Sequence, residues 1–157
     1  MEILKIEWKD MEGMCRKLGA LILASGFKPD IIVGIARGGW IPARLLSDYL
    51  HNKNITSMRV EFYVGVDKRA RKPIVSQEVS VSLRGKRVLL VDDVSDTGES
   101  LLVARKNLRA KGAKQIRVAT LHYKPRSKFK PDYFVGTSSA WIVYPWETDE
   151  TEKARCE

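Results

Sequence analysis

The sequence contains few cysteines and no long hydrophobic segment. Its two cysteines, Cys15 and Cys156, lie far apart in the 157-residue chain, so we see neither a disulfide framework nor the spacing of a cysteine metal site. No apolar run approaches the roughly 20 residues that a membrane-spanning helix requires. The N-terminus also lacks the basic start and apolar core of a signal peptide. We therefore expect a reduced, cytoplasmic protein without a membrane partner.

Length and composition fit one domain with a single core. Hydrophobic residues make up 44% of the sequence, which is enough to bury a sheet. No internal repeat, low-complexity stretch or linker divides the chain. We therefore expect one domain over residues 1–157.

Positive charge is concentrated in two clusters. The net charge is +9, from 28 basic and 19 acidic residues, and the clusters lie at 68–72 and 124–130. Such clusters are most often solvated loops, but they also suit nucleic acid or a small polyanion. Only Phe129 interleaves with the basic residues, so a platform that stacks nucleic-acid bases is poorly supported.

The most informative segment is the block 88–100, which reads VLLVDDVSDTGES. Residues 88–91 predict a buried strand that ends at Asp92 and Asp93, and a polar turn then leads into a helix beginning at Glu99. A helix N-terminus offers free N–H groups and partial positive charge to a phosphate. Carboxylates bind Mg²⁺ or accept hydrogen bonds from sugar hydroxyls. The block therefore predicts a site for a sugar phosphate.

A purely structural role is the alternative for this block. An aspartate before a helix is often an N-cap, and Asp-Thr-Gly is often only a turn. Three aspartates within five residues, Asp92, Asp93 and Asp96, would repel one another unless a cation or ligand joined them. We therefore favour the binding site.

Strands and helices alternate along the rest of the chain. Their periodicity predicts strands at 31–35, 55–64, 77–82, 88–91, 116–122 and 133–135, and helices at 10–25, 42–50 and 99–111. We expect 65–76 to be a charged mobile loop and the residues after 144 to be a charged tail. The alternation predicts an α/β fold with a parallel sheet. Ligands of such sheets bind at the carboxyl ends of the strands, where 36–39, 92–100 and 122–130 fall.

The block 88–100 resembles the 5-phosphoribosyl-1-pyrophosphate (PRPP) binding motif of type I phosphoribosyltransferases. That motif consists of four apolar residues, two acids, a variable pair, Asp-Thr-Gly and a hydroxyl residue, and this chain matches it at every position. Residues 34–43 resemble the pyrophosphate loop of the xanthine-guanine branch, and 141–147 resemble its C-terminal segment. The resemblance covers about 28–147. Asn and Gln together number five, as is typical of thermophiles, so an archaeal member is one alternative.

The resemblance implies an α/β, parallel-sheet type I phosphoribosyltransferase fold, with helices on both faces and a small hood formed by the chain termini around a core of about 28–140. It implies transfer of 5-phosphoribose from PRPP to N9 of a 6-oxopurine (hypoxanthine, guanine or xanthine) with release of pyrophosphate, as in purine salvage. Mg²⁺ is the implied cofactor, and a dimer or tetramer is the implied assembly. Nucleic acid is not an expected partner of such an enzyme.

The resemblance also implies a role for each matching residue. Asp96 matches the proposed general base, which manages the proton at purine N7. The metal is expected at Asp92 and Asp93, directly or through water, with Glu147 as a further candidate. The implied PRPP-binding residues are Asp92, Asp93, Asp96, Thr97, Gly98, Glu99 and Ser100.

The pyrophosphate is expected at Arg37 and Gly38, for which a plain turn with a surface arginine is the alternative. The resemblance implies a non-proline cis peptide bond at Ala36–Arg37. A flexible catalytic loop is implied at 65–76. Its basic residues are candidates to reach pyrophosphate: Lys68, Arg69, Arg71 and Lys72.

The purine is expected at Lys124, Trp141 and Ile142. Lys124 matches a lysine that donates to the purine O6, and a fixed ammonium meets the amino group of adenine badly because a donor is left unpaired. Trp141 matches the aromatic that stacks on the base, and a backbone group just after it reads the ring edge. A surface lysine is the alternative for Lys124, and a packed core aromatic is the interpretation we prefer for Trp146.

Two other functions stay open at this level. A protein of the same fold can sense PRPP and regulate by binding nucleic acid through its basic surface. Lys124 and Trp141 argue against that alternative, because a sensor has less need of base-recognition residues. Transfer to a pyrimidine is the other alternative, and the segment 141–147 disfavours it.

Overall fold

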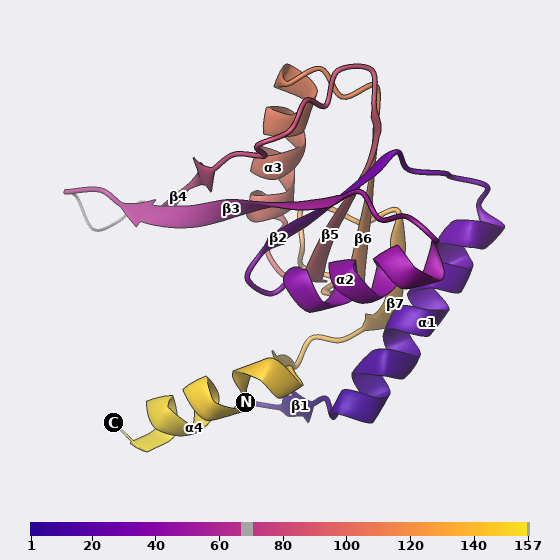
Figure 1. Ribbon diagram of the computed structural model, residues 1–157. Coiled ribbons are helices and arrows are strands. Elements are labelled where there is room, and N and C mark those ends of the chain that lie inside the picture. The colour runs from indigo at the N-terminus through magenta and orange to yellow at the C-terminus, as the bar shows by residue number, and fades with distance from the viewer. Residues whose placement is uncertain (67–70, 157) are drawn as a thin grey trace.

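A six-stranded sheet with the order β4-β3-β2-β5-β6-β7 forms the centre of the protein (Figure 1). The computed structural model describes residues 1–66 and 71–156. Neighbouring strands are parallel except β3 and β4, which pair antiparallel. The strands of this sheet are β2 (Ile31–Ala36), β3 (Ile55–Val64), β4 (Arg71–Gln77), β5 (Arg87–Ser95), β6 (Gln115–Tyr123) and β7 (Tyr133–Thr137).

Helices cover both faces of the sheet, which confirms the predicted α/β fold. Helices α1 (Trp8–Ala24) and α2 (Trp40–Tyr49) pack on one face, and α3 (Glu99–Ala110) packs on the other. Central strand β5 shows why its sequence is apolar without alternation. Leu89 belongs to the core cluster on the α1 and α2 side, whereas Leu90 belongs to the cluster under α3. A parallel strand buried on both faces requires apolar residues at every position.

The two ends of the chain meet in a second, two-stranded sheet. Strand β1 (Ile3–Lys5) pairs parallel with β8 (Trp141–Val143), with Ile3 opposite Trp141. A short 3₁₀ helix η1 (Pro145–Glu147) and helix α4 (Thr148–Cys156) follow. Figure 1 shows this small unit beneath the carboxyl ends of the central strands. The hood that we expected from the termini is therefore confirmed.

Four local predictions were wrong. The strand expected at 77–82 lies earlier, as β4, because pairing with β3 places Val64 opposite Arg71 and so fixes the strand before Gln77. The strand expected to end at residue 91 continues to Ser95, so Asp92 and Asp93 lie within β5, paired beside β6. The tail after 144 begins with η1 and continues as α4. Part of the loop expected at 65–76 is thus a strand, while 67–70 lie outside the described residues.

None of the helices in 1–66 and 71–156 combines the length and the hydrophobicity needed to cross a bilayer.

Candidate functional site

Two adjoining pockets open at the carboxyl ends of β2 and β5. The first has a volume of about 360 Å³ and is lined by the segment that joins β5 to α3, together with Phe62 and Arg71. The second has a volume of about 420 Å³ and lies between the loop after β2 and the C-terminal segment. Asp92 and Ser100 line both pockets. The block 88–100 therefore lies between two neighbouring cavities and contributes residues to both.

The turn before α3 has the form that a phosphate site needs. Gly98 is the N-cap residue and has φ +84°, a conformation that favours glycine. A Cβ atom at Gly98 would also lie 2.6 Å from Ser127 Oγ, so the turn packs directly against the loop after β6. Lys128 N donates to Thr97 O at 2.9 Å, and the Thr97 hydroxyl accepts from Glu99 N at 3.3 Å. The first N–H groups of α3 consequently face the first pocket, where an anion is favoured.

The loop after β2 brings backbone against the acidic end of β5. The Ala36–Arg37 peptide bond is cis, as the resemblance implied. A Cβ atom at Gly38 would lie 2.2 Å from Asp93 Oδ2, so only glycine allows this approach. Gly39 is equally confined, because its Cβ atom would lie 2.4 Å from Val91 O. The two glycines therefore place the Arg37 loop directly beside the carboxylate of Asp93.

Burial and like charge act on the acidic residues of the site. Burial raises the pKa of Asp93 to about 6, with Glu147 adding to the rise. Burial also raises the pKa of Asp92, and the neighbouring Asp93 carboxylate raises it further. Backbone N–H groups oppose this, since Asp93 N donates to Asp92 Oδ1 at 2.9 Å and Val94 N donates to Asp93 Oδ1 at 2.7 Å. Burial likewise raises the pKa of Glu147. Closely placed carboxylates with raised pKa values are characteristic of functional sites.

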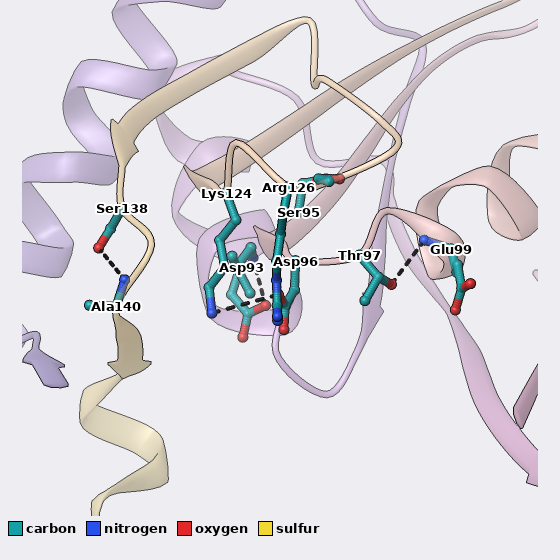
Figure 2. Close-up of polar contacts among 11 residues, drawn as sticks. Asp93, Ser95, Asp96, Thr97, Glu99, Lys124, Arg126, Ser138 and Ala140 are labelled. Atoms are coloured by element: carbon teal, nitrogen blue, oxygen red, sulfur yellow. Dashed lines mark hydrogen bonds and ion pairs between the residues drawn. The ribbon is translucent and has the colours of Figure 1, made fainter. Parts of the chain in front are cut away.

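Two cations converge on Asp96 from the loop after β6 (Figure 2). Arg126 donates to Asp96 Oδ1 through Nη2 and, at 3.0 Å, through Nε. The Lys124 ammonium lies 3.6 Å from the same oxygen. Lys124 is 5% exposed, whereas the Arg126 side chain is 66% exposed. Lys124 is thus a buried, fixed cation, while Arg126 approaches from solvent.

Lys124 also contacts the hood. Its Nζ atom lies 5.8 Å from the ring centroid of Trp141, within the range of a cation–π interaction. Trp141 is 50% exposed, so one face of a large aromatic ring stays open beside a buried ammonium. The backbone N–H of Ala140 donates to Ser138 Oγ at 3.1 Å in the loop that leads to Trp141 (Figure 2). The Trp141 ring can stack on a flat ligand, and the Lys124 ammonium can donate to a carbonyl oxygen of that ligand.

The predicted site residues fall into three groups in the structure. The turn residues Asp92, Asp96, Thr97, Gly98, Glu99 and Ser100 line the first pocket, and Arg37, Gly38, Asp92, Asp93 and Glu147 line the second. The purine candidates Lys124 and Trp141 lie together. The Ile142 side chain is buried in the core, which leaves its backbone for a ligand. Arg69 and Lys68 lie outside the described residues. Arg71 lines the first pocket from β4, whereas Lys72 is exposed.

Sequence reasoning missed four residues around the site. Glu150 on α4 pairs with Arg37 at 3.0 Å, and Arg126 pairs with Asp96. Tyr144 is buried and hydrogen-bonded to both His122 and the Asp93 carbonyl. Arg126 lies in the basic cluster 124–130. Its pairing with Asp96 was not visible in the sequence, because it depends on how the loop after β6 meets the turn before α3. Tyr144 and His122 carried a weak signal, as polar side chains in apolar strand ends.

The carboxylates fit a magnesium ion that is bound partly by ligand and water. Among the described residues no group of three or more His, Cys, Asp or Glu side chains is arranged to hold a metal by itself. Mg²⁺ usually binds through one or two carboxylates and completes its shell with water and substrate phosphates. Asp92 and Asp93 supply carboxylates of that kind beside the Arg37 loop. The donor set therefore suits Mg²⁺ brought in with a phosphorylated ligand.

Comparisons with known proteins agree with this geometry. The family model for the phosphoribosyl transferase domain matches residues 7–153. The hypoxanthine-guanine phosphoribosyltransferase of Schizosaccharomyces pombe is 28% identical over 185 residues, which cover 93% of this chain and 89% of that protein. The xanthine-guanine phosphoribosyltransferase of Gluconobacter oxydans is 28% identical over 145 residues, covering 91% and 83%. The crystal structure of a purine phosphoribosyltransferase from Pyrococcus horikoshii is similar with a TM-score of 0.84 and 38% identity, covering 93% and 94%.

Proposed function

The chain belongs to the phosphoribosyltransferase family, and from this membership we propose that it transfers 5-phosphoribose from PRPP to N9 of hypoxanthine, guanine or xanthine. Pyrophosphate is the second product. The observation that carries the choice of base is the buried Lys124 ammonium beside the open ring of Trp141. The curated relatives named above act on the same class of bases, so we do not propose the regulatory alternative.

In this proposal the first pocket binds the ribose 5-phosphate. The N–H groups at the start of α3 and the hydroxyls of Thr97 and Ser100 face that pocket and match a phosphate. The Asp92 carboxylate lies at the boundary of the two pockets, where it would accept hydrogen bonds from the ribose hydroxyls. The pyrophosphate group then extends into the second pocket, beside Arg37 and Gly38.

In this proposal the base stacks on Trp141 with its O6 edge toward Lys124. The ammonium donates to the O6 carbonyl, and the backbone at Ile142 reads the ring edge. Adenine carries an amino group in place of O6, so the N–H of Lys124 that points to the base would be left without an acceptor. Lys124 therefore selects 6-oxopurines.

The reaction develops positive charge at C1 of the ribose as the bond to pyrophosphate breaks. N9 of the base attacks this carbon, and Asp96 takes up or shares the proton at N7. Arg126 covers Asp96 in the structure, and in this proposal its side chain, which is 66% exposed, moves away from Asp96 when the base binds. Bound Mg²⁺ would neutralise charge on the departing pyrophosphate, and Asp92 and Asp93 are the residues that would hold it, with Glu147 as a further candidate. Positioning and electrostatics then supply most of the acceleration.

One assay tests the proposal directly. The protein is incubated with PRPP and Mg²⁺ and with each of four bases, and the nucleotide and pyrophosphate are quantified together. We expect equal amounts of both products with at least one 6-oxopurine, little product with adenine, and none when EDTA replaces Mg²⁺. Absence of nucleotide with hypoxanthine, guanine and xanthine alike would overturn the proposed function.

Two further properties belong to the same proposal. We expect a homo-oligomer, which light scattering measures, and a cytoplasmic location, which cell fractionation measures. A single domain over 1–157 would give one cooperative unfolding transition.

A further inference from the structure

Tyr144 carries a buried hydroxyl that joins two separate parts of the site. Its side chain is 1% exposed. The hydroxyl donates to the backbone carbonyl of Asp93 at 3.1 Å, and it lies 2.8 Å from His122 Nδ1. A phenol has one proton, so when that proton points to the carbonyl, His122 Nδ1 must carry the hydrogen of the second bond. The order of donation is therefore His122 to Tyr144 to Asp93.

Burial and packing keep the His122 ring neutral and in place as the donor to Tyr144. Burial lowers the pKa of His122 to about 4, so the imidazole is neutral at physiological pH. Gly136 on the neighbouring strand makes room for the ring, because a Cβ atom there would lie 2.6 Å from His122 Cδ2. The Tyr144 ring in turn stacks on Trp146, with centroids 4.9 Å apart and planes 3° from parallel. The His122 ring and the Tyr144 ring are thus both fixed by packing.

Tyr144 lies within the segment 141–147, which contains the base-binding Trp141 and the candidate metal residue Glu147. The backbone of this segment pairs with β1 in the two-stranded sheet. Glu147 Oε2 accepts from Tyr144 N at 3.2 Å, so the acid is tied to the same residue. Within the described part of the chain, the hydrogen bonds that join 141–147 to the six-stranded sheet are those of the Tyr144 hydroxyl.

We propose that Tyr144, supported by His122, is a positioning residue that holds the base-binding segment in register with the acidic end of β5. This inference rests on the proposed function, since it assigns the base to Trp141 and the ribose to the Asp92–Asp93 end. The acidic end keeps its place through pairing with β6. Loss of the hydroxyl therefore releases the base-binding segment and leaves in place the first pocket, which binds the ribose 5-phosphate and is lined by no residue of 141–147.

Tyr144→Phe tests this division of effects, because phenylalanine keeps the ring and removes the hydroxyl. We measure KM for the base at saturating PRPP, and Kd for PRPP with Mg²⁺ in the absence of base by calorimetry. We expect KM for the base to rise about three- to tenfold, the usual range for one net hydrogen bond, while Kd for PRPP changes less than twofold. Tyr133→Phe is the matched control, since it removes a hydroxyl 2.8 Å from Ser25 Oγ at the other end of the strands.

The outcomes separate the two levels of the proposal. A wild-type protein that forms no nucleotide overturns the proposed function and the positioning role with it. An active wild type whose base KM is unchanged in Tyr144→Phe overturns the positioning role alone. A parallel loss of base and PRPP affinity also overturns it, since general damage to the fold produces that pattern.

A second pair of variants decides the matter if Tyr144→Phe does not fold. His122→Asn keeps an N–H donor at the position of His122 Nδ1. His122→Leu places a side chain of nearly the same size as asparagine there but removes the donor. We expect KM for the base to be at least threefold higher in the leucine variant than in the asparagine variant. Equal KM values for the base in the two variants would overturn the proposed role of the hydrogen bonds from His122 to Tyr144 and from Tyr144 to Asp93.

Discussion

Replacement of Asp93 by asparagine should stabilise the free protein while it damages the site. The Asp93 carboxyl is 9% exposed and lies beside Asp92, Glu147 and the Gly38 backbone. Its ionised form is therefore disfavoured in the fold, and burial raises its pKa to about 6 from an ordinary value of 3.8. Asparagine has nearly the same shape and no charge. Its Oδ1 can still accept the hydrogen bond that Val94 N donates at 2.7 Å.

The sign and size of the effect follow from the pKa. A carboxyl whose pKa is higher in the folded state contributes stability below pH 3.8, and that contribution is lost as the pH rises through about 6. A difference of about 2 pH units corresponds to about 3 kcal/mol at about 1.4 kcal/mol per unit. We therefore expect Asp93→Asn to raise the free energy of unfolding at pH 8 by up to about 3 kcal/mol. The gain should shrink toward zero near pH 4.

Urea denaturation followed by tryptophan fluorescence measures this difference, in EDTA at pH 8, 6 and 4. Asp30→Asn is a control of opposite sign. Hydrogen bonds from Arg87 lower the pKa of Asp30 to about 2, so its charge stabilises the fold above pH 3.8 and Asp30→Asn should destabilise the protein at pH 8. If Asp93→Asn were as stable as the wild type or less stable at pH 8, while Asp30→Asn behaved as expected, our account of the acidic site would be refuted.

Three further predictions concern activity. Asp96→Asn should reduce kcat at least a hundredfold and leave Kd for PRPP within about threefold, as expected for a general base; unchanged turnover would exclude that role. Lys124→Ala should reduce the preference for hypoxanthine over adenine about tenfold or more in kcat/KM, because it removes the buried donor; an unchanged preference would show that another group reads O6. Gly38→Ala should weaken PRPP binding at least tenfold, since its Cβ atom would lie 2.2 Å from Asp93 Oδ2; the same change at Gly13 in α1, where a Cβ atom meets nothing within 4 Å, should have little effect.

The central fold was predictable because its signals are local. Continuous apolar runs marked β2 and β5, and helical spacing marked the buried face of α3. The strand near 77 was misplaced because 77–82 alternates polar and apolar residues, whereas 71–77, which reads RKPIVSQ, does not. Only the antiparallel pairing with β3 identifies 71–77 as the strand. Strand register is a property of two segments, so one segment does not reveal it.

The candidate site was predictable where a single loop contains the chemistry. The block 88–100 combines acids, turn and helix start in thirteen consecutive residues, and the structure places them around two adjoining pockets. Contacts between distant segments were not predictable. The Arg37–Glu150 pair and the Tyr144–Asp93 bond join residues that become neighbours only when α4 and the hood fold over the central sheet.

The pairing of β1 with β8 has a consequence for how the protein matures. Ile3 meets Trp141 across almost the entire length of the polypeptide, so closure of this ladder carries the largest loop-entropy cost in the molecule. The central layers can associate earlier through nearer neighbours. A nascent or partly unfolded protein should consequently acquire its ribose 5-phosphate pocket before its nucleobase pocket, and the latter should also be the first to open under mild denaturant.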